Sequence, residues 1–323
     1  MILTAFSFTL TSSYSTILNL NLTSLHNNYT VWGPSARSCI TLMDPKQLED
    51  YERAVKSAAT YFTQNSSQFS QLDAVLASHR LIIVRPSKQS RQDVTAEFAS
   101  DHILGLVSCA YVEQEYAVRQ IFLKTISEHP WLSASAGHIF ESHVLLWLRH
   151  APADLCLHCT PAKESLPLLN IPVCGENMEY FLKVEDLKDA DKYQSPKCWV
   201  PVAQNLPTMD AIVITDEFVI TIQAIISSKH DAKSTGFEKV HICLPSKISA
   251  RQWCHVFLTN SEKAANSLRV NVLKDLPKKM NIHLYSAFFD TNRWDSILTP
   301  GHLEELDQDK VRFIGYIDIH IYW

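Results

Sequence analysis

Two apolar, β-branched runs separated by three polar residues constrain the fold of this chain more than any other feature. The runs cover residues 209–214 and 218–227, and Thr215, Asp216 and Glu217 lie between them. Runs of this length and composition around a short polar break are typical of two antiparallel strands joined by a tight turn. We therefore predict a β-hairpin around which the rest of the chain is arranged.

The length of the turn sets the register of this hairpin. With a two-residue turn at residues 216–217, Thr215 opposes Phe218 across the hairpin. In the same register Asp210 lies directly across from Gln223, and opposed residues point to the same face. The hairpin therefore predicts a carboxylate and a carboxamide side by side.

The second strand alternates in a way that predicts one packed face and one face that can hold a site. Asp210 and Gln223 on the partly polar face would supply oxygen ligands for a hard divalent cation such as Mg²⁺. The alternative is that Asp210 is a turn or cap residue and Gln223 a hydrogen-bonded surface group. The apolar positions that define the packed face are Ile220, Ile222, Ala224 and Ile226.

Residues 199–230, WVPVAQNLPTMDAIVITDEFVITIQAIISSKH, resemble the signature of the nuclease domain of Crinkler and retrotransposon-hot-spot-type proteins. In that signature an aromatic-containing stretch and a Pro precede an Asp, followed by a hydrophobic strand, Gln, Ser and His. Its upstream marker is a Gly before an aromatic-Glu pair on an apolar helix, and residues 137–141, GHIFE, are similar to it. The resemblance covers about residues 95–260 and points to the PD-(D/E)xK, restriction-endonuclease-like superfamily.

The resemblance implies an α/β fold with a mixed central sheet and an αβββαβ restriction-endonuclease-like core, preceded by a mainly helical N-terminal region. It implies a nuclease-like hydrolase, a phosphodiesterase that uses Mg²⁺ or Mn²⁺ and binds nucleic acid, DNA ahead of RNA. It makes Asp210 and Gln223 the metal ligands, Glu141 the helix carboxylate and His230 the polar group after the strand. Such proteins are secreted effectors that reach a host nucleus and contact host protein, or mobile-element proteins.

One position departs from the superfamily pattern, which asks for a Lys two residues after Gln223. This chain has Ile225 there. Either a nearby cation such as Lys229 or Lys233 reaches the catalytic site, or hydrolysis is weak or lost. The alternative function is therefore a catalytically inactive nuclease-fold module that binds nucleic acid or a host protein.

Composition and pattern divide the chain into three parts. We expect residues 1–38, rich in Ser, Thr and Asn, to be poorly ordered, residues 39–130 to be a mainly helical remnant of an upstream ATPase module, and residues 131–323 to be the nuclease-like domain. The pattern G-x-x-x-x-G-K-[ST] does not occur, so we expect no ATP hydrolysis. Periodicity and Pro positions predict helices at 44–80, 101–127, 133–148 and 233–243, and strands at 81–84, 168–184 or 197–202, 253–258 and 311–323.

Charge and hydropathy limit the partners of the chain. A formal net charge of −5 excludes nucleic-acid binding through overall basicity, so such binding requires a local basic patch. No apolar segment approaches the roughly 20 residues of a membrane-spanning helix. Residues 1–38 hold no basic residue before Arg37, so the charged start of a signal peptide is missing.

The eight cysteines predict buried free thiols. Cys156 and Cys159, with His158 between them and Cys174 downstream, suggest zinc as an alternative, but a structural zinc site normally needs a second closely spaced pair. We expect no disulfides, because a chain of 323 residues can form a core without them.

Overall fold

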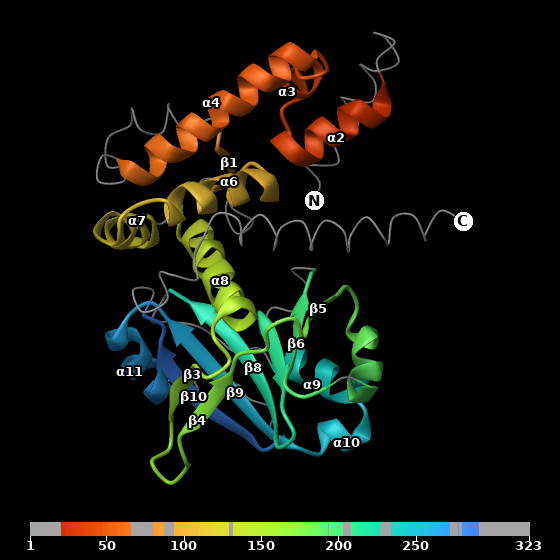
Figure 1. The fold of residues 1–323 in the computed structure, drawn as a ribbon, viewed down its shortest axis with the longest axis vertical. Helices are drawn as coiled ribbons and strands as arrows, with labels where there is room; N and C mark the ends of the chain where they lie inside the picture. The colour runs from red at the N-terminus through yellow and green to blue at the C-terminus, as the bar shows by residue number, and fades with distance from the viewer. Residues whose placement is uncertain are drawn as a thin grey trace. The chain divides into compact units, whose positions relative to one another are not determined.

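The computed structural model divides into two compact units between Ala136 and Gly137. Each unit is described by itself, and both appear in Figure 1. The residues that the structure describes are 21–65, 80–86, 94–128, 132–192, 194–202, 208–226, 234–271, 277 and 280–290.

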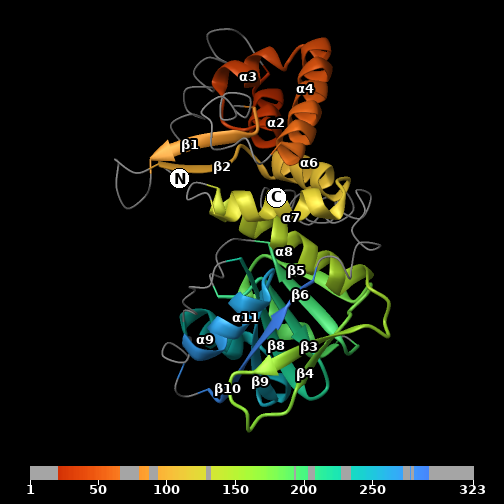
Figure 2. The same cartoon turned by 90° about the vertical axis from the view of Figure 1, so that its left-hand side faces the viewer.

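The N-terminal unit is mainly helical, as predicted. Its aromatic core includes Phe62, whose ring lies 5.5 Å from that of Phe122 and 6.2 Å from that of Phe98 between centroids. A two-stranded antiparallel sheet accompanies the helices and is seen clearly in Figure 2. The elements are α2 (Leu22–Trp32), α3 (Ala36–Thr41), α4 (Pro45–Gln64), β1 (Ile82–Pro86), β2 (Val94–Phe98), α6 (Asp101–Val112) and α7 (Tyr116–Glu128).

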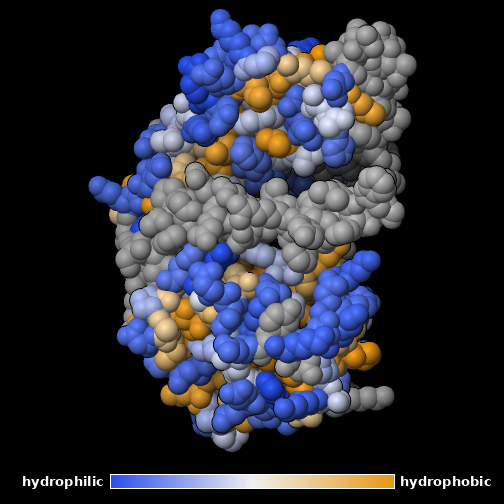
Figure 3. Space-filling view, turned by 45° about the vertical axis from the view of Figure 1, so that its right-hand side comes forward, coloured by the Kyte–Doolittle hydropathy of each residue, from blue (hydrophilic) through white to orange (hydrophobic). Residues whose placement is uncertain are grey.

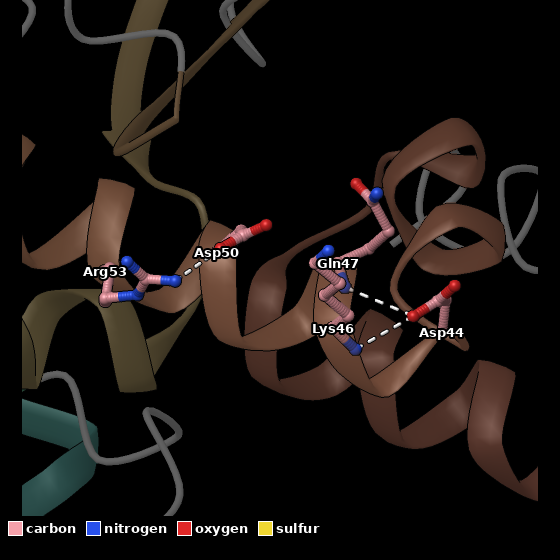
Figure 4. A network of polar contacts seen from close by, with 5 residues as sticks. All are labelled: Asp44, Lys46, Gln47, Asp50 and Arg53. Carbon is pink, nitrogen blue, oxygen red and sulfur yellow. Dashed lines mark hydrogen bonds and ion pairs between the residues drawn. The ribbon is translucent and has the colours of Figure 1, made fainter.

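Helix α4 begins where the Asp-Pro pair predicts. The Asp44 carboxylate accepts hydrogen bonds from the backbone N–H groups of Lys46 at 2.8 Å and Gln47 at 3.3 Å. These donors have no partner within the helix, so Asp44 acts as its N-cap. One turn further on, Arg53 forms an exposed ion pair with Asp50 (Figure 4).

Three expectations for this unit require correction. The helix expected at 44–80 ends at Gln64, and Asn65 is its C-cap. Part of the start that we expected to be poorly ordered is helix α2, whose N-cap Asn21 accepts hydrogen bonds from two backbone amides; residues 1–20 lie outside the described residues. The single helix expected at 101–127 is two helices. The side chains of Gln114 and Arg119 donate to the carbonyl groups of Ala110 and Val112, which stabilises the end of α6 without a Gly or Pro.

The C-terminal unit contains an eight-stranded mixed sheet, so the predicted α/β fold class is confirmed. The strand order is β4-β3-β10-β9-β8-β7-β6-β5. The chain enters this unit through α8 (Ser133–His150). The elements that follow are β3 (Cys156–Pro161), β4 (Leu169–Pro172), β5 (Met178–Phe181), the 3₁₀ helix η2 (Val184–Lys192), β6 (Lys197–Pro201), β7 (Ala211–Ile214), β8 (Phe218–Ile225), α9 (Ser234–Cys243), α10 (Ser246–Ser249), β9 (Gln252–Thr259), α11 (Glu262–Asn271) and β10 (Ile282–Phe288).

The hairpin β7–β8 has the predicted register. Ile214 pairs with Val219, and Ala211 pairs with Ile222. At the turn, the Thr215 N–H donates to the Phe218 carbonyl at 2.9 Å, as a two-residue turn requires. β6 and β7 are antiparallel, as are β7 and β8, whereas β8 and β9 are parallel across α9. The elements α8, β6, β7, β8, α9 and β9 therefore follow one another in the order αβββαβ, with β3, β4, β5 and η2 inserted after α8 and the short α10 inserted after α9.

Helices lie on both faces of the central strands, so the partly polar face of β8, which we expected could hold a site, is also packed. Figures 1 and 2 show α8 on one side of the sheet and α9 and α11 on the other. Val219 and Ile225, on the face expected to be partly polar, belong to a core cluster with Phe237 and Val240 of α9. Strands buried on both faces are expected where crossover helices cover a sheet.

The surface gives little further indication of partners. On the side shown in Figure 3, hydrophilic and hydrophobic residues are interspersed over both units. None of the described helices is both long enough and apolar enough to cross a membrane. The strand expected at 311–323 lies outside the described residues.

Candidate functional site

Asp210 lies immediately before β7, where the ladder between β7 and β8 ends. Its N–H donates to the Ile222 carbonyl at 2.8 Å, and its Oδ2 accepts from the Ala224 N–H at 2.7 Å. If β7 were longer, a backbone carbonyl of that strand would accept the hydrogen bond from the Ala224 N–H. Here the Asp210 carboxyl accepts it instead. Asp210 is thus bonded to Ile222 and Ala224, the two neighbours of Gln223, and Gln223 is the residue expected to oppose Asp210.

Helix α8 contributes two further ionisable side chains to this end of the sheet. Glu141 is partly buried, and its Oε2 lies 3.5 Å from Nδ1 of His138 one turn earlier on the helix. The charges of Glu141 and His138 both act on Asp210. Glu141 therefore lies close enough for its charge to act on Asp210, another predicted site residue, although the two are far apart in the sequence.

The pKa of Asp210 is raised from its ordinary value of 3.8 to about 8. Removal of the carboxyl from water is the largest cause, and the negative charge of Glu141 adds to it. The hydrogen bond from Ala224 and the charge of His138 act in the opposite direction. Carboxyl groups whose pKa is strongly raised by burial and by a nearby charge are found often in functional sites.

Gln223 and Ile225 lie deeper than the sequence suggested. Gln223 is only 4% exposed and Ile225 only 5%. Both side chains are enclosed between β8 and the helices that cover it, so Ile225 is a core residue. The position where the superfamily pattern asks for a lysine is therefore filled by an apolar side chain of the core cluster.

A buried polar pair on the neighbouring rung shows that this face accommodates hydrogen-bonded groups within the core. Thr221 pairs with His255 between β8 and β9, and its Oγ1 lies 2.8 Å from His255 Nδ1. The Thr221 hydroxyl also lies 3.3 Å from the Cys254 carbonyl. With its proton donated to that carbonyl, the hydroxyl oxygen accepts from Nδ1 of the ring. His255 is fully buried against Phe237 and Phe257, as is typical of a core histidine.

Three other predicted residues have no described position. Lys229, His230 and Lys233 all lie outside the described residues. Sequence reasoning did not assign a role to His138, although its spacing three residues before Glu141 on a helix places both on one face. That spacing was the available signal for it.

The side chains at this end of the sheet include oxygen donors of the kind that a hard divalent cation binds. Two carboxyls and a carboxamide are oxygen donors, and a cation near Asp210 would offset both the burial and the charge of Glu141 that raise the pKa of Asp210. Among the described residues, no group of three or more His, Cys, Asp or Glu side chains is placed to hold a metal ion. The metal assignment of Asp210 and Gln223 therefore remains a prediction.

The zinc alternative finds no support in the described cysteines. Cys156 and Cys159 lie on the same strand at positions of opposite parity, so their side chains leave opposite faces of β3. Between them, the exposed His158 lies with Nδ1 2.6 Å from Oδ1 of Asn170 on β4. All eight cysteines are free thiols in the structure.

No family model matches the chain, and neither a curated protein nor a solved structure shows significant similarity to it.

Proposed function

We propose that the C-terminal unit is a divalent-cation-dependent nuclease, a phosphodiesterase module of the Crinkler type, which acts on DNA ahead of RNA. The observation that supports this most is that Glu141 of α8 acts through its charge on Asp210, which lies immediately before β7. The order α8, β6, β7, β8, α9, β9 agrees with the αβββαβ core that the sequence resemblance implies.

In this proposal each carboxyl has its own task. Asp210, fixed through its Oδ2 by the Ala224 N–H, would hold the cation together with the Gln223 carboxamide. Mg²⁺ or Mn²⁺, when bound, supplies the positive charge that polarises a phosphodiester and lowers the pKa of a nearby water. Glu141 accepts the proton of the attacking water at its free carboxylate oxygen, and His138 orients Glu141 through the contact at Oε2.

The test is a cleavage assay with single-stranded and double-stranded DNA and RNA in Mg²⁺, Mn²⁺ or EDTA. We expect cation-dependent cleavage that falls by about 10²-fold or more in both Asp210→Asn and Glu141→Gln. Asp216→Asn is the matched control, because Asp216 is an exposed carboxylate at the turn of the same hairpin. Cleavage that is equally fast in Asp210→Asn would place the chemistry elsewhere.

The second candidate is a catalytically inactive nuclease-fold module that binds nucleic acid or a host protein. The burial of Ile225 favours it, because no cation stands at the position where the superfamily pattern places its lysine. The same preparations distinguish the two candidates by fluorescence anisotropy with labelled oligonucleotides. Binding without cleavage in every cation supports the inactive module, and absence of both supports a protein partner.

A further inference from the structure

Gly236, the third residue of helix α9, lies against the segment that leads into Asp210. A Cβ added to Gly236 would lie 2.4 Å from Oγ1 and 2.8 Å from Cβ of Thr208. Both distances are well below the roughly 3.5 Å at which non-bonded heavy atoms pack. Glycine therefore fits here where a larger residue does not, although glycine weakens the interior of a helix.

The segment on the other side of this contact is enclosed in the core. Thr208 and Met209 are 0% and 1% exposed, and Phe237, which follows Gly236 on the helix, is fully buried as well. Met209 and Phe237 belong to the same core cluster. Because such cores are close-packed, Thr208 can make room for a larger side chain at Gly236 only if the backbone moves.

Asp210 is held from the other side by β8. Its N–H donates to the Ile222 carbonyl at 2.8 Å, and its Oδ2 accepts from the Ala224 N–H at 2.7 Å. Only Met209 separates Asp210 from Thr208, so a shift of Thr208 is passed along the backbone to the Asp210 carboxyl. A group of a catalytic site that is displaced by about 1 Å loses on the order of 10²-fold in rate.

We propose that Gly236 is a positioning residue for Asp210. Because Gly236 has no side chain, the start of α9 lies close to Thr208 and holds the Asp210 carboxyl where β8 also binds it. This role rests on the proposed nuclease function, in which Asp210 would hold the cation. Gly236 itself acts through Thr208 and contacts neither the cation nor the substrate.

The first test compares Gly236→Ala with the native sequence in the oligonucleotide cleavage assay with Mn²⁺. We expect kcat to fall by about 10²-fold and KM to change by less than about threefold, because the contacts that bind the substrate are not altered. In the double variant Gly236→Ala/Thr208→Gly, the side-chain atoms that the new Cβ would meet are absent. We therefore expect kcat of the double variant to return to within about tenfold of the native value.

Val240→Ala is the control for a loosened helix. Val240 is a fully buried residue of α9 in the core cluster, and its truncation destabilises the protein without adding an atom near Thr208. At a temperature where both single variants are folded, we expect Val240→Ala to keep the native kcat. An equal loss of kcat in Val240→Ala and Gly236→Ala, or no recovery in the double variant, would overturn the proposal.

A second measurement does not depend on cleavage. The Ala224 amide donates to Asp210 Oδ2, so its hydrogen exchange, followed by NMR, reports whether the carboxyl is in place. Relative to the other amides of β8, we expect exchange at Ala224 to be about tenfold faster in Gly236→Ala and native in the double variant. If no preparation cleaves nucleic acid, the nuclease proposal fails, and exchange at Ala224 still decides whether Gly236 positions Asp210. Unchanged exchange there would show that it does not.

If Gly236→Ala does not fold, Thr208→Ala takes its place in both measurements. This substitution removes the Thr208 oxygen nearest to Gly236 and adds no atom. Asp210 then loses support on the side of α9, so we expect faster exchange at Ala224 and a lower kcat. Native values of both would contradict the positioning role.

Discussion

Replacement of Asp210 by Asn should stabilise the protein at alkaline pH. Asp210 has a pKa of about 8 in the folded protein, against 3.8 as its ordinary value. At pH values between these two numbers, Asp210 is therefore protonated in the folded protein and ionised in the unfolded protein. Asn cannot ionise, and its Oδ1 can still accept the hydrogen bond from Ala224.

The sign and size of the effect follow from proton linkage. Because the folded state binds the proton more tightly, the contribution of Asp210 to stability falls as pH rises from about 4 to about 8 and is constant outside that range. A tenfold change in an acid constant corresponds to about 1.4 kcal/mol, so the full penalty amounts to roughly 6 kcal/mol. Between pH 5 and pH 8.5, we expect Asp210→Asn to gain at least about 2 kcal/mol relative to the native sequence.

Urea unfolding of both proteins at pH 5.0, 7.0 and 8.5, in EDTA and followed by circular dichroism, measures this difference. Asp216→Asn is the control, and its difference from the native sequence should not depend on pH in the same way because Asp216 is exposed. Glu141→Gln should act in the same direction as Asp210→Asn but less strongly, since it removes a charge that adds to the effect of burial on the pKa of Asp210. A difference between Asp210→Asn and the native sequence that stays constant from pH 5.0 to 8.5 would refute the reasoning.

Three further substitutions test the packing. Asp44→Ala should lower the free energy of unfolding, measured in urea, by about 1 kcal/mol, because it removes the N-cap of α4. Gly236→Ala should lower the melting temperature, because the new Cβ would lie 2.4 Å from Oγ1 and 2.8 Å from Cβ of Thr208. Gly137→Ala is the control. Its new Cβ meets no atom within 4 Å, so the melting temperature of this variant should rise. Ile225→Lys should cost about 3 kcal/mol or more in urea unfolding, since it buries a charge in the core cluster, and unchanged stability would show that the side chain reaches water.

The hairpin could be predicted because its information is local. Alternation along residues 218–227 and the three polar residues before it determine both the strands and the turn. Helix α9 and strand β9 follow from similar local patterns. Strands β3 and β10 were not predicted, because the polar side chains and proline in CLHCTP and the mixed side chains in IHLYSAF obscure the alternation.

The site was less accessible to sequence reasoning. The resemblance led to Glu141 and Asp210, but the charge interaction between them depends on how far each is withdrawn from water, which no local pattern contains. The burial of Gln223 and Ile225 depends on α9, which covers a face that alternation alone predicts to be partly polar. The alternation along a strand predicts which residues share a face, but it does not predict which elements pack against that face.

The lengths of the strands in the eight-stranded sheet bear on its tendency to aggregate. Both edge strands, β4 and β5, have four residues, whereas the central strands β8 and β9 have eight. An edge strand offers unpaired backbone groups to other chains, and a short edge offers few of them. The longest apolar strands, β8 and β9, would form amyloid-like stacks most readily if they were isolated, but both are paired on each side within the sheet. Aggregation is therefore expected during folding, while β8 is still exposed.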